Sequence, residues 1–248
     1  MFLILAACAA PVDSAEPVPA DPTAGWVVGS GPVATLSGQA FLFGPAPELS
    51  FAEAEVYVME DPSFLSPVAA DGSFAIAVPT GAPVSLVLRH PELASVQSAT
   101  LTFGEDGLDD VGFQVPTVAI VELMAKASDV YLEPDRCQFV STVSSAASPP
   151  YGGAGVGEPD AIVTLHPAVP AGTTGPVYFD YLSDALILPD PALEATTIDG
   201  GVIFSNLPVG EWTMLATKPG VSFTRPVARC QAGAIVNAAP PHGVETIR

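Results

Sequence analysis

The sequence predicts an all-β protein built from two β-sandwich domains, and three observations support this fold class. The chain contains 27 Pro and 22 Gly among 248 residues, which disfavours long helices. Its apolar residues fall in short runs that alternate with small or polar residues and end at turn pairs such as Asp71-Gly72. One arrangement of turn, strand, turn and strand occurs twice along the chain. We therefore expect two copies of one supersecondary unit.

Composition and charge exclude several classes of function. The chain has 27 acidic and 7 basic residues, giving a formal net charge of −20. Such a surface repels phosphate backbones, so we expect no nucleic-acid partner. It also disfavours docking of the folded domains on anionic lipid headgroups. The charge is typical of a protein kept soluble outside the cytoplasm or in a salty setting, with collection of cations as the alternative.

The N-terminus carries the signal for localisation. Residues 1–7 are apolar and run into Cys8, and residues 5–8 read Leu-Ala-Ala-Cys. This resembles the lipobox of bacterial lipoproteins, which implies a signal peptide at 1–7 and a lipidated Cys8. The sequence departs from that pattern because no Lys or Arg precedes the apolar run. The alternative is an apolar terminus with an incidental cysteine.

The lipobox implies a place in the bacterial cell envelope. Residues 8–31 are rich in Pro, Ala and Asp and read as a flexible tether. No other segment approaches the ~18 apolar residues of a membrane span, so attachment to the membrane is expected through the N-terminal lipid alone. We expect anchoring to the outer membrane, facing either the periplasm or the surface.

Residues 32–116 are predicted to form the first sandwich. Phe74, Ile76 and Val78 alternate with small residues, as a strand with one buried face should. The predicted strand regions are residues 33–41, 53–59, 70–81, 84–88, 102–103 and 111–115.

Residues 197–220 are the stretch around which the rest of the chain is organised. They contain an Asp199-Gly200 turn, an apolar run, a second turn at 206–210 and an alternating strand that includes Trp212. Asp-Gly supplies the positive φ of a tight turn, and period-2 alternation places every second side chain on one face. This pattern predicts a β-hairpin.

The same pattern is present in the first half. Residues 71–74 match residues 199–202, and residues 79–81 match residues 208–210. The two pairs are offset by 128 and 129 positions, so one small insertion aligns them. Two copies of one unit explain this better than chance.

A strand, Asp-Gly-x-Phe, a short strand, Pro-x-Gly and another alternating strand together resemble the carboxypeptidase regulatory-like module. That resemblance implies two transthyretin-like, Ig-like β-sandwiches of roughly seven strands each. It covers most of residues 32–116 and the later part of the second half. The second copy departs from the pattern, with Val202 where the first has Phe74. Because these motifs are turn chemistry, they indicate a fold and no activity.

Residues 117–134 are predicted to be a helical connector, with a helix from Thr117 to Ser128. Thr117 can cap the helix, and an apolar stripe recurs at i, i+3, i+4 and i+7. That stripe consists of Ile120, Leu123, Met124 and Ala127. We expect the stripe to pack on a sandwich, and binding of a partner is the alternative.

Residues 135–248 are predicted to form the second sandwich, with Cys137 and Cys230 near its ends. If Cys8 carries lipid, an exported chain with two remaining cysteines is expected to form one disulfide. Two buried free thiols are the alternative. The tail at 240–242 is expected to hang free beyond this bond. The predicted strands are residues 139–143, 161–165, 177–181, 223–229 and 234–237, besides the hairpin.

The sequence contains no convincing catalytic or metal-binding constellation. His242 and Glu245 have the spacing of a zinc carboxypeptidase motif, but the chain lacks the further His that follows in those enzymes. His90, His166 and His242 are expected to be unconnected loop residues. Tyr178 and Tyr181 lack the neighbouring His pair of an iron site. The acidic turn at Glu105 to Asp110 is expected to be solvated, with calcium binding as the alternative.

The two tryptophans are the last candidate residues. Trp212 lies on an alternating strand and is expected in the core, whereas Trp26 is the better candidate for an exposed contact.

We expect no catalytic residues, no metal site and no cofactor. The predicted function is a lipid-anchored binding or structural module, with an envelope protein or polysaccharide as the partner. The alternative is an enzyme-accessory domain that binds metal or carbohydrate.

Overall fold

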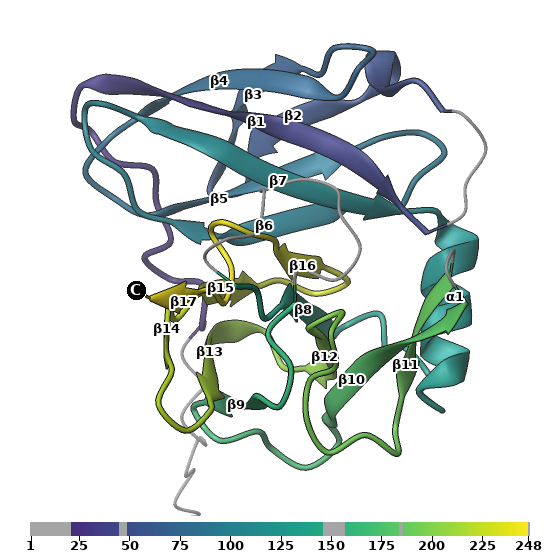
Figure 1. The fold of residues 1–248 in the computed structure, drawn as a ribbon. Helices are drawn as coiled ribbons and strands as arrows, with labels where there is room; N and C mark the ends of the chain where they lie inside the picture. Colours follow the sequence, from purple (N-terminus) through teal and green to yellow (C-terminus); the bar gives the residue numbers. More distant parts are fainter. Residues whose placement is uncertain (1–20, 45–48, 146–156, 184–185, 248) are drawn as a thin grey trace, which may run out of the picture.

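The computed structural model describes residues 21–44, 49–145, 157–183 and 186–247, and these residues form an all-β sandwich architecture with one α-helix (Figure 1). The predicted all-β sandwich class is confirmed. Strands of the first half lie at the top of Figure 1 and those of the second half at the bottom, with helix α1 along one side.

The first half forms strands where small and apolar residues alternate. In β4, for example, Phe74, Ile76 and Val78 are buried while Ala75 and Ala77 are exposed, as the period-2 pattern predicts. The elements of this half are β1 (Val33–Phe43), η1 (Phe51–Glu53), β2 (Glu55–Val58), β3 (Asp61–Pro67), β4 (Ser73–Pro79), β5 (Val84–Arg89), β6 (Val96–Leu101) and β7 (Leu108–Pro116).

The second half begins with the helix and continues in strands. Its elements are α1 (Val118–Ala127), β8 (Cys137–Thr142), β9 (Ile162–His166), β10 (Thr174–Ser183), β11 (Leu186–Asp190), β12 (Gly201–Leu207), β13 (Gly210–Thr217), β14 (Ser222–Phe223), β15 (Val227–Cys230), β16 (Ile235–Ala238) and β17 (Thr246–Ile247).

A nine-stranded sheet passes through both halves in the order β11-β10-β12-β8-β16-β6-β5-β2-β3. A three-stranded sheet, β4-β1-β7, covers it in the first half, and another, β15-β13-β9, covers it in the second. Strands β14 and β17 pair as a short ribbon.

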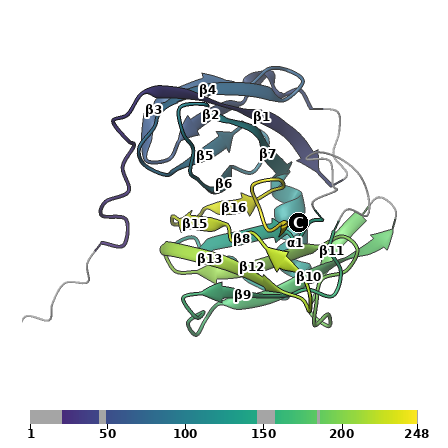
Figure 2. The same cartoon turned by 60° about the vertical axis from the view of Figure 1, so that its left-hand side comes forward.

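Strand β16 joins the two halves of the large sheet. It runs parallel to both neighbours, with Val236 opposite Gln97 of β6 and opposite Phe139 of β8. Figure 2 shows β16 lying between β6 and β8. A segment near the end of the chain therefore covers a sheet edge that each half would otherwise expose.

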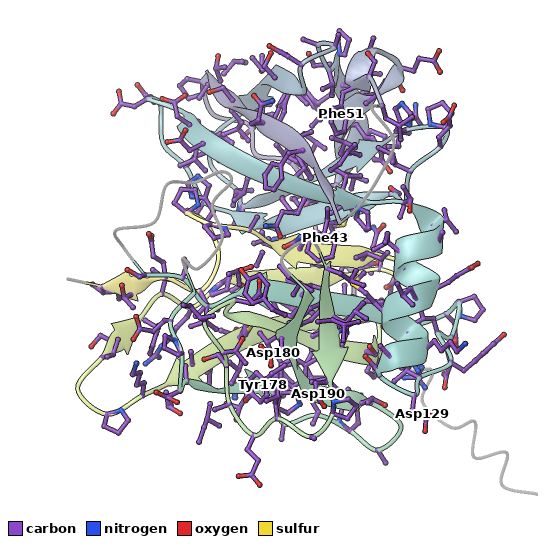
Figure 3. The ribbon with its side chains drawn as sticks, turned by 45° about the vertical axis from the view of Figure 1, so that its right-hand side comes forward. Phe43, Phe51, Asp129, Tyr178, Asp180 and Asp190 are labelled. Atoms are coloured by element: carbon purple, nitrogen blue, oxygen red, sulfur yellow. A yellow bond between two sulfur atoms is a disulfide. The ribbon has the colours of Figure 1, made fainter. Side chains whose placement is uncertain are left out.

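Each half has a separate hydrophobic core. One cluster contains buried residues from Leu36 to Val115, and the other contains residues from Cys137 to Val244 together with Ala99 of β6. Figure 3 places Phe51 in the upper half and Tyr178 in the lower half. The domain boundaries that the sequence indicates remain a prediction.

The predicted hairpin at residues 197–220 is wrong. Strand β12 pairs with β8 and β10 in the large sheet, whereas β13 pairs with β9 and β15 in the small one. The chain therefore crosses the core between the sheets. Pro208 has no N–H to donate, and Gly210 has a φ of 151°, which favours glycine. The first copy behaves alike, since β4 and β5 also lie in different sheets.

The predicted helix is confirmed. Thr117 caps it, because its hydroxyl oxygen accepts a hydrogen bond from the backbone N–H of Ile120. Ile120 is buried, and Met124 packs beside Val177, Phe179 and Ile203 on the outer face of the large sheet. Leu123, which the predicted stripe includes, is exposed.

Candidate functional site

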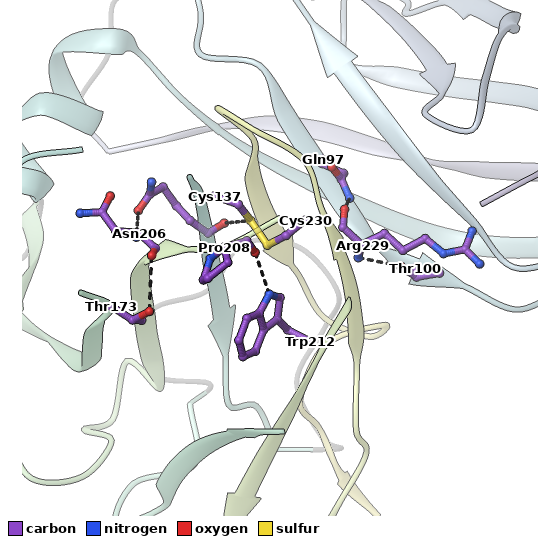
Figure 4. The surroundings of a disulfide bond; sticks show 10 residues. Gln97, Thr100, Cys137, Thr173, Asn206, Pro208, Trp212, Arg229 and Cys230 are labelled. Atoms are coloured by element: carbon purple, nitrogen blue, oxygen red, sulfur yellow. Dashed lines mark hydrogen bonds between the residues drawn. A yellow bond between two sulfur atoms is a disulfide. The ribbon is translucent and has the colours of Figure 1, made fainter. Parts of the chain in front are cut away.

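Cys137 and Cys230 form the predicted disulfide. Their Cα atoms lie 5.6 Å apart, inside the range that disulfide geometry permits, and both residues are fully buried. The bond joins the start of β8 to the end of β15 (Figure 4). Nearby, Trp212 is buried as expected, and its indole N–H donates to the carbonyl oxygen of Pro208 over 3.0 Å.

Arg229, which precedes the disulfide cysteine, forms a buried ion pair between the halves. Its Nη1 lies 2.7 Å from Oε1 of Glu60, and the two side chains are 10% and 0% exposed. The Glu60 carboxylate also accepts the backbone N–H of Ser85, and Arg229 Nη1 donates to the carbonyl oxygen of Pro83. We call Arg229, Glu60 and their partners the junction cluster.

Further contacts fix Arg229 against the first half. Its backbone N–H donates to Thr100 Oγ1, and the side chain of Gln97 donates to its carbonyl oxygen over 2.7 Å (Figure 4). The Trp26 ring lies over the guanidinium, 5.7 Å from Cζ to the ring centroid. Trp26 is therefore partly covered by an internal contact, which corrects its expected role as an exposed contact.

The lipidation candidate Cys8 lies outside the described residues. Within the part of the chain that the structure describes, no group of three or more His, Cys, Asp and Glu residues is placed to hold a metal ion. This search includes the acidic turn at 105–110. Among the same residues, no helix has both the length and the apolar character needed to cross a membrane.

The three histidines occupy different parts of the fold. His90 Nδ1 accepts the backbone N–H of Glu92, and His166 ends β9. His242 Nε2 donates to the carbonyl oxygen of Asp109 over 2.7 Å.

The C-terminal tail also contacts the fold, because Val244 is fully buried. The tail from 240 onward is therefore packed against the fold, contrary to the expectation that it hangs free.

Tyr178 is buried in the second core, and its hydroxyl group contacts the opposite sheet. Its hydroxyl oxygen accepts the backbone N–H of Val163 over 2.9 Å, so it caps one donor of the small-sheet strand β9. Burial raises the pKa of this hydroxyl, and the hydrogen bond from Val163 partly opposes the rise.

A groove of about 960 Å³ opens at one end of the second sandwich, between the β9–β13 edge and the β14–β17 ribbon. We call it the β13–β14 groove. Ala216, Val221 and Phe223, which belong to or pack on the second core, supply its apolar wall. Its other lining residues are Asp160, Ile162, Thr217, Lys218, Pro219, Ser222, Thr224, Arg225 and Ile247.

The two cations of the groove differ in their surroundings. Lys218 Nζ lies 2.6 Å from Oε1 of Glu158 and also donates to the carbonyl oxygen of Pro159. Arg225 is exposed and forms no ion pair or hydrogen bond with any residue in the described ranges. The groove therefore contains one neutralised cation, the exposed carboxylate of Asp160, and one cation, Arg225, that has no acidic partner in the described ranges.

Sequence reasoning missed both the groove and the junction cluster. Arg225 and Arg229 lie in a stretch that the pattern predicts only as a strand. The one available signal is their rarity, because the chain has 7 basic residues against 27 acidic ones.

The fold and this geometry define the class broadly as an all-β sandwich protein with an internal disulfide. No protein-family model matches the chain, and no curated protein matches it. Three solved structures illustrate its weak similarities.

The Bacillus anthracis TIE protein is 13% identical, with 87% of this chain and 34% of that chain covered and a TM-score of 0.26. A streptococcal ancillary pilin is 9% identical, with 87% and 69% covered and a TM-score of 0.25. A chain from a type II cohesin–X-dockerin complex of Acetivibrio cellulolyticus is 11% identical, with 47% and 80% covered and a TM-score of 0.30. This chain thus spans about a third of the TIE protein chain. Likeness at this level transfers neither family nor function.

Proposed function

We propose that this protein is a non-catalytic module of the bacterial cell envelope, anchored through lipid on Cys8 and acting by binding or by supporting structure. The observation that carries the proposal is the buried Cys137–Cys230 disulfide. Such bonds persist in oxidising compartments outside the cytoplasm, which agrees with export directed by residues 1–7.

The start of the described chain supports a tether that ends at the folded body. Trp26 contacts Arg229, and the backbone N–H of Gly31 donates to the carbonyl oxygen of Thr80 over 2.9 Å. A Cβ on Gly31 would lie 2.4 Å from Thr80 Oγ1, so this approach requires glycine. Trp26 and Gly31 therefore contact the fold, which supports a tether shorter than residues 8–31.

The anchor is tested by Cys8→Ala in the native precursor with its own leader. We expect loss of labelling by radioactive palmitate and release from the membrane fraction, because the acyl chains attach through this cysteine. The matched control is Cys137→Ala, which removes a cysteine and leaves labelling intact. Continued labelling and membrane association of Cys8→Ala would refute the anchor.

A further inference from the structure

We propose that the β13–β14 groove binds the carboxyl-terminal end of a peptide chain with aliphatic last residues, presented by a protein partner in the envelope. This rests on the proposed function as a binding module and adds the chemistry of the partner. Three features of the groove support it, namely an unpaired cation, an aliphatic lining and an accessible hydroxyl.

The cation is the first feature. Four of the basic residues in the described chain already have acidic partners, which are Arg89–Glu55, Arg136–Glu133, Lys218–Glu158 and Arg229–Glu60. Arg225 and Lys126 have none within the described ranges, although acidic residues outnumber basic ones about four to one, and Arg225 is the one of these two that lines the groove. A guanidinium presents parallel N–H groups that match a carboxylate. Asp160 also lines the groove but forms no ion pair with Arg225, so an anionic carboxylate is favoured at the Arg225 guanidinium itself.

The lining is the second feature. Ile162 and Ile247 are 53% and 56% exposed and both line the groove, so they form an aliphatic rim. Ala216 and Val221 continue this aliphatic surface inward. A volume of about 960 Å³ admits several residues of an extended peptide. Covering the two isoleucines would remove apolar surface from water, which stabilises a complex.

The polar groups of the groove distinguish a peptide from a saccharide. Ser222 is exposed, and its side-chain hydroxyl forms no hydrogen bond within the described chain, so this hydroxyl can serve a peptide group or the carboxylate. The hydroxyl groups of Thr217 and Thr224 already donate hydrogen bonds to the carbonyl oxygens of Ile162 and Gly243, respectively. Phe223 is the aromatic residue of the lining, and it is buried. The groove thus presents no exposed ring on which a sugar could stack.

The test uses the full chain carrying Cys8→Ser and an N-acetylated hexapeptide that ends in Val-Ile. The peptide is titrated by calorimetry with either a free carboxylate or a carboxyl-terminal amide. We expect saturable binding of the acid and a loss of about tenfold for the amide, since one charge-assisted interaction is removed. Arg225→Gln should cause the same loss for the acid and leave the weak affinity for the amide unchanged.

The control variant is Lys126→Gln, which removes an exposed cation from the unrelated helix α1 and should leave affinity unchanged. Ile162→Thr keeps a β-branched residue in an exposed strand position and should weaken both peptides. Equal binding of acid and amide, wild-type affinity in Arg225→Gln, or no saturation by the acid would overturn the proposal. Tighter binding of digalacturonic acid than of the peptide would also overturn it. Lipid labelling of Cys8 is independent of these outcomes and tests the proposed function separately.

Discussion

Asp71 and Asp199 occupy matching turns of the two repeats, yet their surroundings shift their pKa values in opposite directions. Asp71 is exposed, and hydrogen bonds from the backbone and side chain of Ser73 lower its pKa. Asp199 is half-buried, so desolvation raises its pKa. The hydrogen bond from the Gly201 N–H partly opposes this rise, and the negative charge of nearby Asp180 adds to it. Burial therefore reverses the electrostatic role of one repeated residue.

Asp199→Asn should stabilise the protein at neutral pH. A carboxyl with a raised folded-state pKa favours folding most below its ordinary pKa of 3.8, and this contribution is lost as pH rises through the folded-state value. Asparagine keeps an acceptor for the Gly201 N–H and cannot ionise. We expect a higher urea midpoint than wild type at pH 7, with the difference shrinking toward pH 4.

Asp71→Asn is the matched control, with the sign reversed. A lowered folded-state pKa contributes stability above 3.8 and loses it as pH falls. This variant should therefore be less stable than wild type at pH 7 and approach it in acid. Equal urea midpoints for Asp199→Asn and wild type at pH 7 would contradict the role assigned to burial.

At the scale of elements, the buried ion pair between the two halves can be compared with an exposed ion pair within the first half. Arg229–Glu60 is buried between β15 and the turn after β2, whereas Arg89–Glu55 joins β5 and β2 with side chains 61% and 41% exposed. Both pairs have a closest N···O distance of 2.7 Å. Distance is therefore matched, and burial is the variable that distinguishes them.

Glu60→Gln should destabilise the protein far more than Glu55→Gln. Removing one partner of a buried pair costs about 3–5 kcal/mol, whereas an exposed pair contributes about 0.2–1 kcal/mol. In Glu60→Gln the remaining acidic partner of Arg229 among the described residues is Glu211, which is 56% exposed and 3.8 Å from Arg229 Nε. Urea unfolding measures both variants. Similar losses of unfolding free energy would show that Arg229 is solvated or finds another partner. A double variant with Arg229→Met should recover part of the loss.

Some strands could not be predicted from their own patterns. Strand β3 contains Pro62 and Pro67, which the large sheet tolerates because β3 is an edge strand. Strand β6 contains Gln97 and Ser98, which read as exposed yet are buried. Gln97 is satisfied by the carbonyl oxygen of Arg229, a partner 132 positions away. No local pattern contains that information.

At the scale of the whole molecule, the two cores share one sheet through β16. This strand follows Cys230 closely, and the disulfide fixes Cys230 to the first residue of its neighbour β8. The junction cluster adds contacts between β15 and the first half. We therefore expect the halves to unfold together, although each has its own core.

Replacing both cysteines by serine should lower the stability of both halves. The disulfide closes a loop of sequence separation 93, which stabilises by about 4–5 kcal/mol in the chain-entropy model. Loss of this constraint would loosen β16 and expose the edges of β6 and β8. Hydrogen exchange should show faster opening in β2 and β5 as well as in β8. Unchanged protection in β2 and β5 would show that the halves are independent.

The sequence by itself determined the all-β class, the capped helix, the buried Trp212 and the pairing of Cys137 with Cys230. These follow from turn residues, alternation and cysteine count, which are local or compositional signals. Tertiary structure alone decided that the repeated unit crosses between sheets, that β16 joins the halves and that Arg225 lies unpaired at a groove. The physical reason is that each of these depends on which distant strand completes a sheet edge or supplies a partner, and period-2 alternation is the same whichever strand lies alongside.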